Sequence, residues 1–138
     1  MIDVDFFKQF NDRFGHGAMT RRCSGSHARC SSRCVAATSW RATGGEEFVV
    51  ILHDTTAEQA LERLEQMRHL VSREDVLPDR AEPTRMTVSI GVADRPHDGE
   101  TALDIVAEAD RRLFAAKEAG RNRVVGPPRS APALARGA

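Results

Sequence analysis

An uninterrupted apolar run, Phe48-Val-Val-Ile-Leu52, constrains the fold most, because it has the length of a strand and is too short for a helix. A segment that is apolar at every position is typical of a strand buried on both faces of a sheet. The T-x-x-Q pattern from Thr56 to Gln59 predicts a helix N-terminus with a capping box. That helix is expected to run to about Arg73 and to bury one apolar stripe. The stripe consists of Ala57, Ala60, Leu61, Leu64, Met67 and Val71. A buried strand followed by an amphipathic helix indicates an α/β domain with helices packed on a sheet.

Strand-like and helix-like segments alternate along the rest of the chain. Arg85 to Ala93, RMTVSIGVA, is rich in β-branched residues and predicts another strand. Thr101 is expected to cap a helix that runs through Ala119 and stops at Gly120. The residues predicted to face inward from this helix are Leu103, Val106, Ala107 and Phe114. The shorter expected elements are a strand end at Met1 to Val4, a helical turn from Phe6 to Phe14 ended by Gly15, and a last strand from Asn122 to Val125.

The charge balance excludes one class of function. Lys and Arg together number 20, as do Asp and Glu, so the formal net charge is zero. Binding of nucleic acid through bulk charge needs a basic excess, so no nucleic-acid partner is expected, although a local basic site for a phosphate group is compatible with this balance. No apolar run approaches the roughly 20 residues of a membrane span, and the N-terminus lacks the pattern of a signal peptide. Three cysteines are an odd number for a disulfide framework, which predicts a cytoplasmic location.

One internal segment differs in composition from its surroundings. Residues 18–43 contain no Asp, Glu, Leu, Ile or Phe, and they hold all three cysteines and the only Trp. Residues 127–138, PPRSAPALARGA, have nothing to pack and are expected to be a disordered tail. We therefore predict one domain over residues 1–126, interrupted by an aberrant segment at 17–43.

Two acidic clusters are candidates for a metal site. Asp3 and Asp5 flank Val4 at a strand end, while Glu46 and Glu47 follow Gly44-Gly45 just before the apolar run. Two glycines before a strand suggest a tight hairpin turn, which can aim a carboxylate at a neighbouring strand end. If Asp3 and Glu46 meet there, they form an all-oxygen site suited to Mg²⁺ and a triphosphate. The alternative is a pair of solvated acidic turns.

Four motifs together resemble the GGDEF family of diguanylate cyclases. They are MIDVDFFKQFNDRFGH, GGEEFVVIL, TVSIGVA and ADRRLFAAKEAGRNRVV, and they cover roughly residues 1–17 and 44–126 in the family's order and at its approximate spacing. The resemblance implies a single α/β domain with a mixed central sheet and packed helices, of the nucleotidyl-cyclase or palm type. It also implies Mg²⁺-dependent condensation of two GTP to cyclic di-GMP with release of two pyrophosphates, in bacterial second-messenger signalling, with Mn²⁺ as an alternative metal. Catalysis would need a homodimer, because each domain would bind one GTP.

The resemblance also implies roles for individual residues. Asp3, Glu46 and the Val4 carbonyl would bind the metal, and Glu47 is the second acid of the catalytic signature. The remaining implied substrate-binding residues are Phe6 and Phe7 through their backbone N–H groups, Asn11 at the guanine edge, and Lys117 and Arg121 at the terminal phosphates. For the last two, the alternative is a charged last helical turn that offsets the helix dipole.

The chain departs from the family pattern at three places. It begins inside the family's first strand, so the preceding helices and the sensory domain expected upstream are absent from it. Residues 17–43 lack the family's G-D-x-x-L helix and the ARYG-like strand, and Thr20 stands where a guanine-binding Asp is expected. Val35 to Thr38 stand where the RxxD motif of product inhibition is expected, so this inhibition should be absent. Since a shifted reading frame restores these motifs at the right length, we hypothesise that residues 17–43 are translated out of frame.

Two alternative functions remain open from the sequence. The first is a catalytically inactive GGDEF remnant that binds GTP or a partner. The second is a zinc-stabilised interaction module, since Cys23, His27, Cys30 and Cys34 offer the four ligands of a Cys₃His site.

Overall fold

A computed structural model of the chain describes residues 1–15, 38–42, 46–78 and 80–128. Five strands form one sheet in the order β2-β3-β1-β4-β5. The strands are β1 (Ile2–Val4), β2 (Thr38–Ala42), β3 (Glu47–Leu52), β4 (Val88–Gly91) and β5 (Val124–Val125). Only the β4–β5 pair is parallel among these strands, so the prediction of an α/β domain with a mixed sheet is confirmed.

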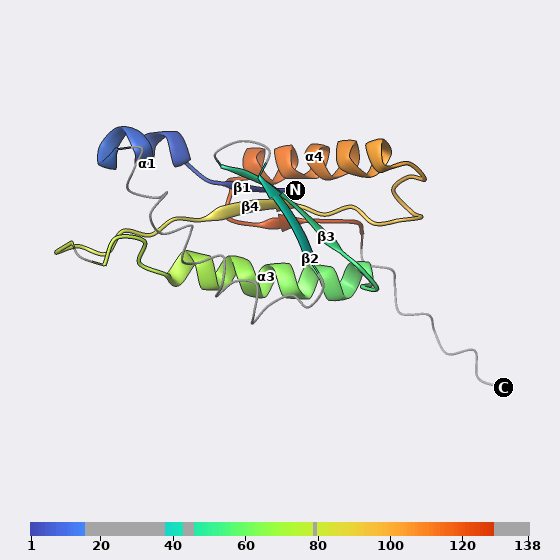
Figure 1. The fold of residues 1–138 in the computed structure, drawn as a ribbon, viewed down its shortest axis with the longest axis horizontal. Coiled ribbons are helices and arrows are strands. Elements are labelled where there is room, and N and C mark those ends of the chain that lie inside the picture. Colours follow the sequence, from blue (N-terminus) through green and yellow to red (C-terminus); the bar gives the residue numbers. More distant parts are fainter. Residues whose placement is uncertain (16–37, 43–45, 79, 129–138) are drawn as a thin grey trace.

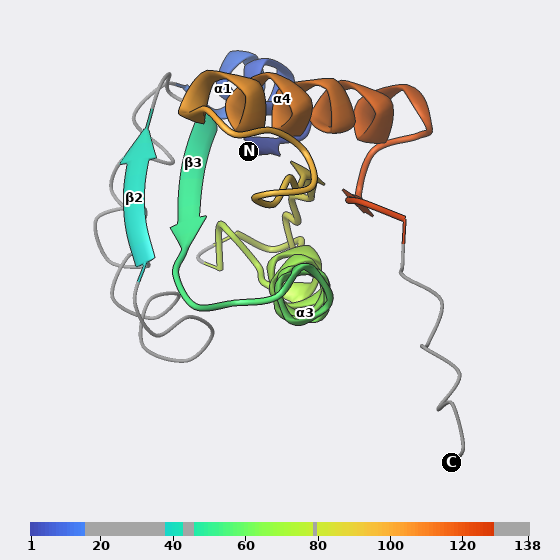
Figure 2. The ribbon, with the colours of Figure 1, turned by 90° about the vertical axis from the view of Figure 1, so that its right-hand side faces the viewer.

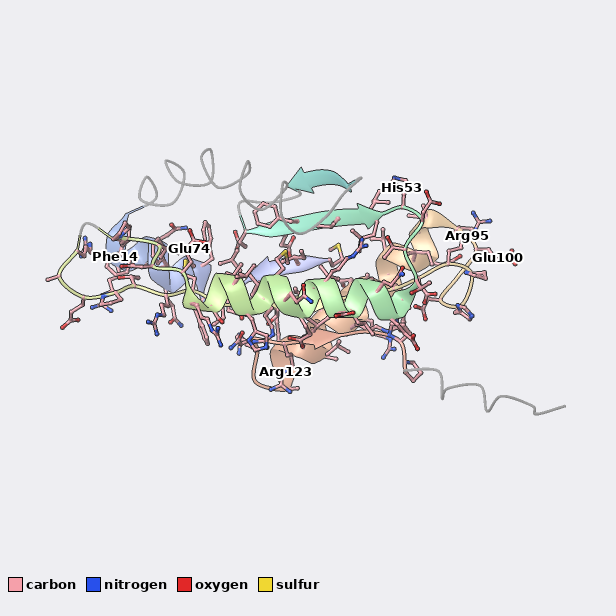
Figure 3. All side chains as sticks on the ribbon, turned by 90° about the horizontal axis from the view of Figure 1, so that it is seen from below. Phe14, His53, Glu74, Arg95, Glu100 and Arg123 are labelled. Carbon is pink, nitrogen blue, oxygen red and sulfur yellow. The ribbon has the colours of Figure 1, made fainter. Side chains whose placement is uncertain are left out.

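Helices lie on both faces of this sheet. Within the described residues the helices are α1 (Phe7–Phe14), α3 (Ala57–Arg73) and α4 (Ala102–Glu118). Figures 1 and 2 show α3 on one face and α4 on the other, with α1 leading away from the end of β1. Seen from the α3 side in Figure 3, Phe14 and Glu74 lie at one end of the molecule, while His53, Arg95 and Glu100 lie at the opposite end. None of the helices in the described ranges is long and apolar enough to cross a membrane.

The two long helices begin as the sequence predicts. Thr56 accepts a hydrogen bond from the Gln59 N–H at 3.3 Å, and the Gln59 side chain accepts one from the Thr56 N–H at 3.1 Å. Thr101 and Asp104 form the same reciprocal arrangement at the start of α4. Capping boxes satisfy N–H groups that a helix terminus leaves without intrahelical partners. The predicted start and end of α3 are confirmed.

The main core lies between α3 and the sheet. Ala60, Leu64 and Met67 from the predicted stripe are buried, and Leu61 and Val71 pack at its edge. The strand residues of this core alternate along β1 and through β4 into the next residue, as the period of a strand requires. They are Ile2, Val4, Val88, Ile90 and Val92. The residues between them, Asp3, Ser89 and Gly91, therefore point to the face that α4 covers.

The predicted inward face of α4 is wrong. Leu103, Val106 and Phe114 are 81%, 44% and 63% exposed, and Ala107 is also exposed. The residues that α4 buries are Ala109, Arg112, Leu113 and Ala116. The reason lies at Gly91, where a Cβ atom would collide with the carbonyl oxygen of Ala109 and the backbone nitrogen of Leu113. Helix and strand approach backbone to backbone at this point, which turns the face with Ala109 and Leu113, rather than the predicted one, toward the sheet.

Replacing Gly91 by Ala is therefore expected to destabilise the domain by about 1–3 kcal/mol, the usual cost of overpacking a tight contact. Chemical unfolding measures this directly. Gly126→Ala is the matched comparison, since its Cβ would meet the flexible end of the Leu61 side chain rather than backbone. We expect a smaller loss at Gly126, and equal losses at the two glycines would contradict the close approach.

Three strand predictions also need correction. Thr38–Ala42 form β2 and pair antiparallel with β3, although residues 17–43 were not expected to contain a strand. The strand forms because it pairs with β3, and the composition of this segment does not reveal that pairing.

The run Phe48–Leu52 does form a strand, but it is only half-buried, and Ile51 is 51% exposed. Figure 2 shows that β2 and β3 extend to one side of α3, which explains why this strand is not buried on both faces. The strand predicted over Arg85–Ala93 is shorter, covering Val88–Gly91.

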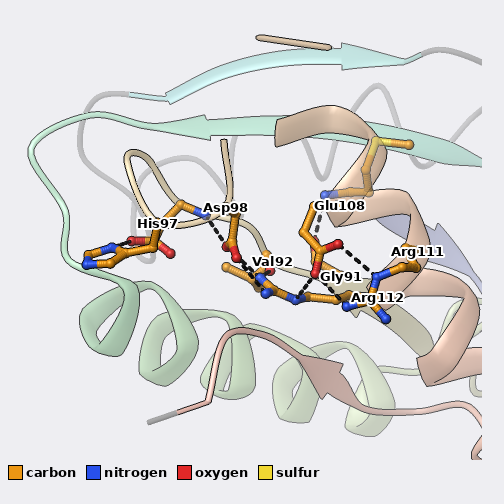
Figure 4. Close-up of polar contacts among 9 residues, drawn as sticks. Gly91, Val92, His97, Asp98, Glu108, Arg111 and Arg112 are labelled. Carbon is orange, nitrogen blue, oxygen red and sulfur yellow. Dashed lines mark hydrogen bonds and ion pairs between the residues drawn. The ribbon is translucent and has the colours of Figure 1, made fainter. Parts of the chain in front are cut away.

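A buried arginine attaches α4 to the loop that precedes it (Figure 4). The Arg112 guanidinium donates to both carboxylate oxygens of Asp98, at 2.6 and 2.7 Å, and to the Val92 carbonyl at 2.6 Å. It also lies 2.9 Å from Glu108 on the same helix. Because Arg112 donates to it, the pKa of the Asp98 carboxyl is lowered from 3.8 to about 2. The neighbouring Arg111 pairs with Glu108 but is largely exposed.

Candidate active site

Most of the predicted site residues line one cavity at the end of β1. Its volume is about 280 Å³, and it lies where β1, the start of α1, the start of β3 and the end of α4 meet. Its lining residues are Asp3, Val4, Phe6, Phe7, Lys8, Gln9, Glu46, Lys117 and Arg121. Seven of these nine were predicted, and the structure adds Lys8 and Gln9. Lys8 belongs to the DxDFFK motif, which was a signal for its inclusion.

Asp3 and Lys117 form an ion pair inside this cavity. The Lys117 Nζ atom lies 2.9 Å from Asp3 Oδ2, and the two side chains are 10% exposed for Asp3 and 30% exposed for Lys117. A carboxylate at that depth needs a cation or hydrogen-bond donors to offset its desolvation. The ammonium engages one oxygen, and a carboxylate offers about four acceptor sites in all. Asp3 therefore retains the capacity to bind a further cation.

Backbone pairing brings Glu46 and Glu47 next to β1. The Val4 N–H donates to the Glu46 carbonyl at 3.1 Å, and Asp3 is the Cα partner of Glu47 in the antiparallel β1–β3 pair. Directly opposed residues of an antiparallel pair share a face of the sheet. Asp3 and Glu46 line a common cavity. Glu47 lies opposite Asp3 in the strand pair but does not line the cavity. Gly44 and Gly45 lie outside the described residues.

The donor set fits a hard divalent cation. Carboxylate and carbonyl oxygens are the ligands that Mg²⁺ prefers. Within the described parts of the chain, no three His, Cys, Asp or Glu side chains group around a common point. In proteins Mg²⁺ is usually held by one or two carboxylates together with substrate phosphates.

The N-terminus of α1 faces the same cavity. Phe6 precedes the helix with φ 58°, and no side chain caps this end. The first N–H groups of a helix have no intrahelical partner and carry partial positive charge, which makes such an end a site for phosphate. Phe7, Lys8 and Gln9, the first residues of α1, line the cavity.

Arg121 reaches the cavity through a Schellman motif at the end of α4. The Arg121 N–H donates to the Ala116 carbonyl at 3.0 Å, and the Gly120 N–H donates to the Lys117 carbonyl at 3.3 Å. Gly120 has φ 108°, a conformation that glycine adopts at low cost. The predicted stop at Gly120 is confirmed. Lys117 is in the last turn of α4, whereas Arg121 lies beyond the end of the helix.

The Arg121 guanidinium stacks on the Phe6 ring. Its Cζ atom lies 4.8 Å from the ring centroid, within the range of a cation–π interaction. Both residues have positive φ, 62° and 58°, and the Phe6 side chain is 55% exposed. The stacking places a cation beside the N-terminus of α1.

Asn11 lies on α1 outside the lining of this cavity. It is buried, and within the described ranges its Oδ1 atom has no hydrogen-bond partner. An unpaired buried amide oxygen is costly. Thr20, the four proposed zinc ligands and the segment 16–37 lie outside the described residues, as does the tail from residue 129.

These features define a class of site: carboxylates for a divalent cation beside a helix N-terminus and two basic side chains, as a nucleoside polyphosphate requires. The chain belongs to the GGDEF family, since the family model described as "Diguanylate cyclase, GGDEF domain" matches residues 1–123. Diguanylate cyclase A of Treponema denticola is 37% identical over 127 residues, which span 90% of this chain and 33% of that protein. Response regulator PleD of Caulobacter vibrioides is also 37% identical over 127 residues, spanning 91% of this chain and 28% of PleD. The chain thus spans about a third of the length of these relatives.

Solved structures show the same fold. The active GGEEF domain of a diguanylate cyclase from Vibrio cholerae superposes with a TM-score of 0.81 at 29% identity, covering 94% of this chain and 81% of that one. The GGDEF domain of DgcB from Caulobacter crescentus, solved in complex with c-di-GMP, gives a TM-score of 0.73 at 31% identity. That alignment covers 91% of this chain and 74% of the DgcB domain.

Proposed function

We propose that this chain is a diguanylate cyclase domain that condenses two GTP molecules to cyclic di-GMP and two pyrophosphates. The observation that carries the proposal is the cavity shared by Asp3, Glu46, the N-terminus of α1, Lys117 and Arg121. The active GGEEF domain from Vibrio cholerae, which has the same fold, supports it. The activity would be cytoplasmic, as part of bacterial second-messenger signalling.

Each residue has a distinct role in this reaction. Asp3 and Glu46, with the Val4 carbonyl, would hold Mg²⁺ or Mn²⁺, and Glu47 is the further acid at this edge of the sheet. When bound, the metal activates the ribose 3′-hydroxyl and offsets charge that develops on the α-phosphate and the leaving group. The N–H groups at the start of α1 bind phosphate oxygens and orient the α-phosphate.

Lys117 and Arg121 bind the terminal phosphates. They neutralise the charge of the departing pyrophosphate, and the planar guanidinium donates two parallel hydrogen bonds to phosphate oxygens. Asn11 accepts a hydrogen bond from the guanine edge. In each half-reaction a 3′-oxygen forms a bond to the α-phosphorus of the other nucleotide, and the bond from that phosphorus to the pyrophosphate oxygen breaks. Two domains, each holding one GTP, would therefore face each other in a homodimer.

The experiment is to incubate the purified chain with GTP and Mg²⁺ and to quantify cyclic di-GMP and pyrophosphate by chromatography. The expected result is one cyclic di-GMP for every two pyrophosphates, abolished by removal of the divalent cation. Equilibrium binding of GTP is measured in parallel. If GTP binds and no product forms, the chain is a nucleotide-binding remnant and the proposal is wrong.

A further inference from the structure

Asp5 is a buried carboxylate next to the cavity, and it has no role in the mechanism above. It is 3% exposed and follows Asp3 by two residues, so both lie on the α4 side of β1. Its Oδ1 atom accepts a hydrogen bond from Ser89 Oγ at 2.7 Å. Its Oδ2 atom accepts from Thr87 Oγ1 at 2.7 Å and from the Asn122 N–H at 3.1 Å. The first two bonds join β1 to β4 and its preceding residues, and the third reaches the loop after α4.

The loop that Asp5 contacts has an unfavourable backbone conformation. Arg121 and Asn122 have φ of 62° and 46°, in the left-handed region. For residues with a side chain this region is unfavourable, although Asn tolerates it better than most. Such conformations persist only where surrounding interactions enforce them. The structure must therefore contain groups that hold these two residues in place.

Four hydrogen bonds hold Arg121 and Asn122 among the described residues. The Schellman bond from the Arg121 N–H to Ala116 ties them to α4. The Arg121 carbonyl accepts from the Arg123 Nε at 3.1 Å, and the Asn122 side-chain oxygen accepts from Arg68 Nη1 on α3 at 2.7 Å. The Asn122 N–H donates to Asp5, and this bond alone among the four connects the loop to the chain that leaves β1, which carries Asp3. Because the Asn122 nitrogen directly follows the Arg121 carbonyl, the bond to Asp5 restrains the ψ angle of Arg121.

Asp5 also directly precedes Phe6, the residue on whose ring Arg121 stacks. The Asp5 carboxylate thus binds the loop that carries Arg121, and the next residue, Phe6, provides the ring on which the Arg121 guanidinium stacks. Both sides of this contact line the cavity, together with Asp3.

We propose that Asp5 is a positioning residue that holds Arg121 at the phosphate end of the cavity without contacting the nucleotide itself. This proposal rests on the proposed function, which assigns Arg121 to the GTP phosphates. It gives the two aspartates of the D-x-D sequence different roles, since Asp3 faces the ligand and Asp5 orders the loop that contributes a cation to it.

A double-mutant cycle on GTP affinity tests this role. Asp5→Asn keeps the shape of the side chain and weakens the bond to the Asn122 N–H, and Arg121→Ala removes the group through which Asp5 is proposed to act. Each single variant is expected to weaken GTP binding about tenfold, the scale of one charge-assisted hydrogen bond. The double variant should be no weaker than Arg121→Ala alone. Additive losses would show that Asp5 does not act through Arg121 and would overturn the proposal.

Ser89→Ala is the matched control. It removes another buried hydrogen bond to the same carboxylate but leaves the Asn122 bond in place. We expect a lower melting temperature and unchanged GTP affinity, whereas a loss of affinity equal to that of Asp5→Asn would indicate general loosening of the strand and would contradict the positioning role.

If Asp5→Asn does not fold, the α-hydroxy analogue of asparagine at position 122 deletes only the N–H that Asp5 accepts. It should reproduce the tenfold loss, and unchanged affinity would overturn the proposal.

The proposed cyclase activity and the positioning role of Asp5 fail in different ways. A wild-type chain that binds GTP but gives no cyclic di-GMP refutes the cyclase activity and leaves the cycle measurable. A wild-type chain that makes cyclic di-GMP but shows an additive cycle refutes the role of Asp5 alone.

Discussion

Glu46→Gln is expected to abolish the proposed formation of cyclic di-GMP and to leave the fold intact. The substitution removes a carboxylate charge from the cavity, while the Glu46 carbonyl that accepts from the Val4 N–H is unchanged. Metal ions contribute several kcal/mol of charge stabilisation in phosphoryl transfer, so the expected fall in turnover is about a thousandfold. Initial rates with saturating GTP and Mg²⁺ measure this effect, and a thermal melt verifies folding.

Glu100→Gln is the control for this experiment. Glu100 is exposed and lies at the end of the molecule opposite Phe14 and α1 (Figure 3), so the same chemical change there should leave turnover unaltered. Turnover of Glu46→Gln within tenfold of the unmodified chain would refute the assignment of Glu46 to the metal.

Arg112→Leu is expected to destabilise the domain by about 3–5 kcal/mol, because it leaves the carboxylate of Asp98 buried without its cation. The matched variant, Arg111→Leu, removes a neighbouring arginine whose side chain is 69% exposed. Exposed ion pairs contribute little, so its expected effect is at most about 1 kcal/mol. Urea unfolding of both variants measures the difference. Equal losses would mean that the Arg112–Asp98 pair does not hold the loop to α4.

The Arg112–Asp98 ion pair also predicts how the stability of the domain changes at acid pH. The pKa of Asp98 is about 2 in the folded domain, below its ordinary value of 3.8, because Arg112 donates to the carboxylate. A depressed folded pKa contributes stability that is fully present above the unfolded pKa and is lost as pH falls through the folded one. Stability should therefore fall between about pH 4 and pH 2, and in Arg112→Leu this part of the fall should be smaller.

The site could be predicted from the sequence to a large extent, because its residues stand at the ends of elements with strong local signals. Thr56 and Thr101 mark two helix starts, and Gly120 marks a helix end. Asp3 lies in β1 and Glu46 directly precedes β3, and the pairing of these strands brings the two acids together. What the sequence did not reveal depends on distances between elements. The exposed Phe114 and the buried Arg112 on α4 depend on which face of the helix packs against Gly91, a residue on another element.

The role of Asp5 was also inaccessible from local patterns. Its donors come from Thr87, Ser89 and Asn122, which are far from it in the chain and meet it only through the sheet order. The strand β2 depends in the same way on its pairing with β3. Local sequence thus identified the residues that line the cavity better than those that hold them in place.

The backbone contact at Gly91 has a mechanical consequence for the phosphate end of the cavity. The contact falls at Ala109 and Leu113, near the middle of α4, a rod of 17 residues and about 25 Å. Leu103 and Lys117 lie on opposite sides of this contact along the helix. If α4 tilted as a rigid rod about the contact, its Leu103 end and the Lys117 partner of Asp3 would move in opposite directions.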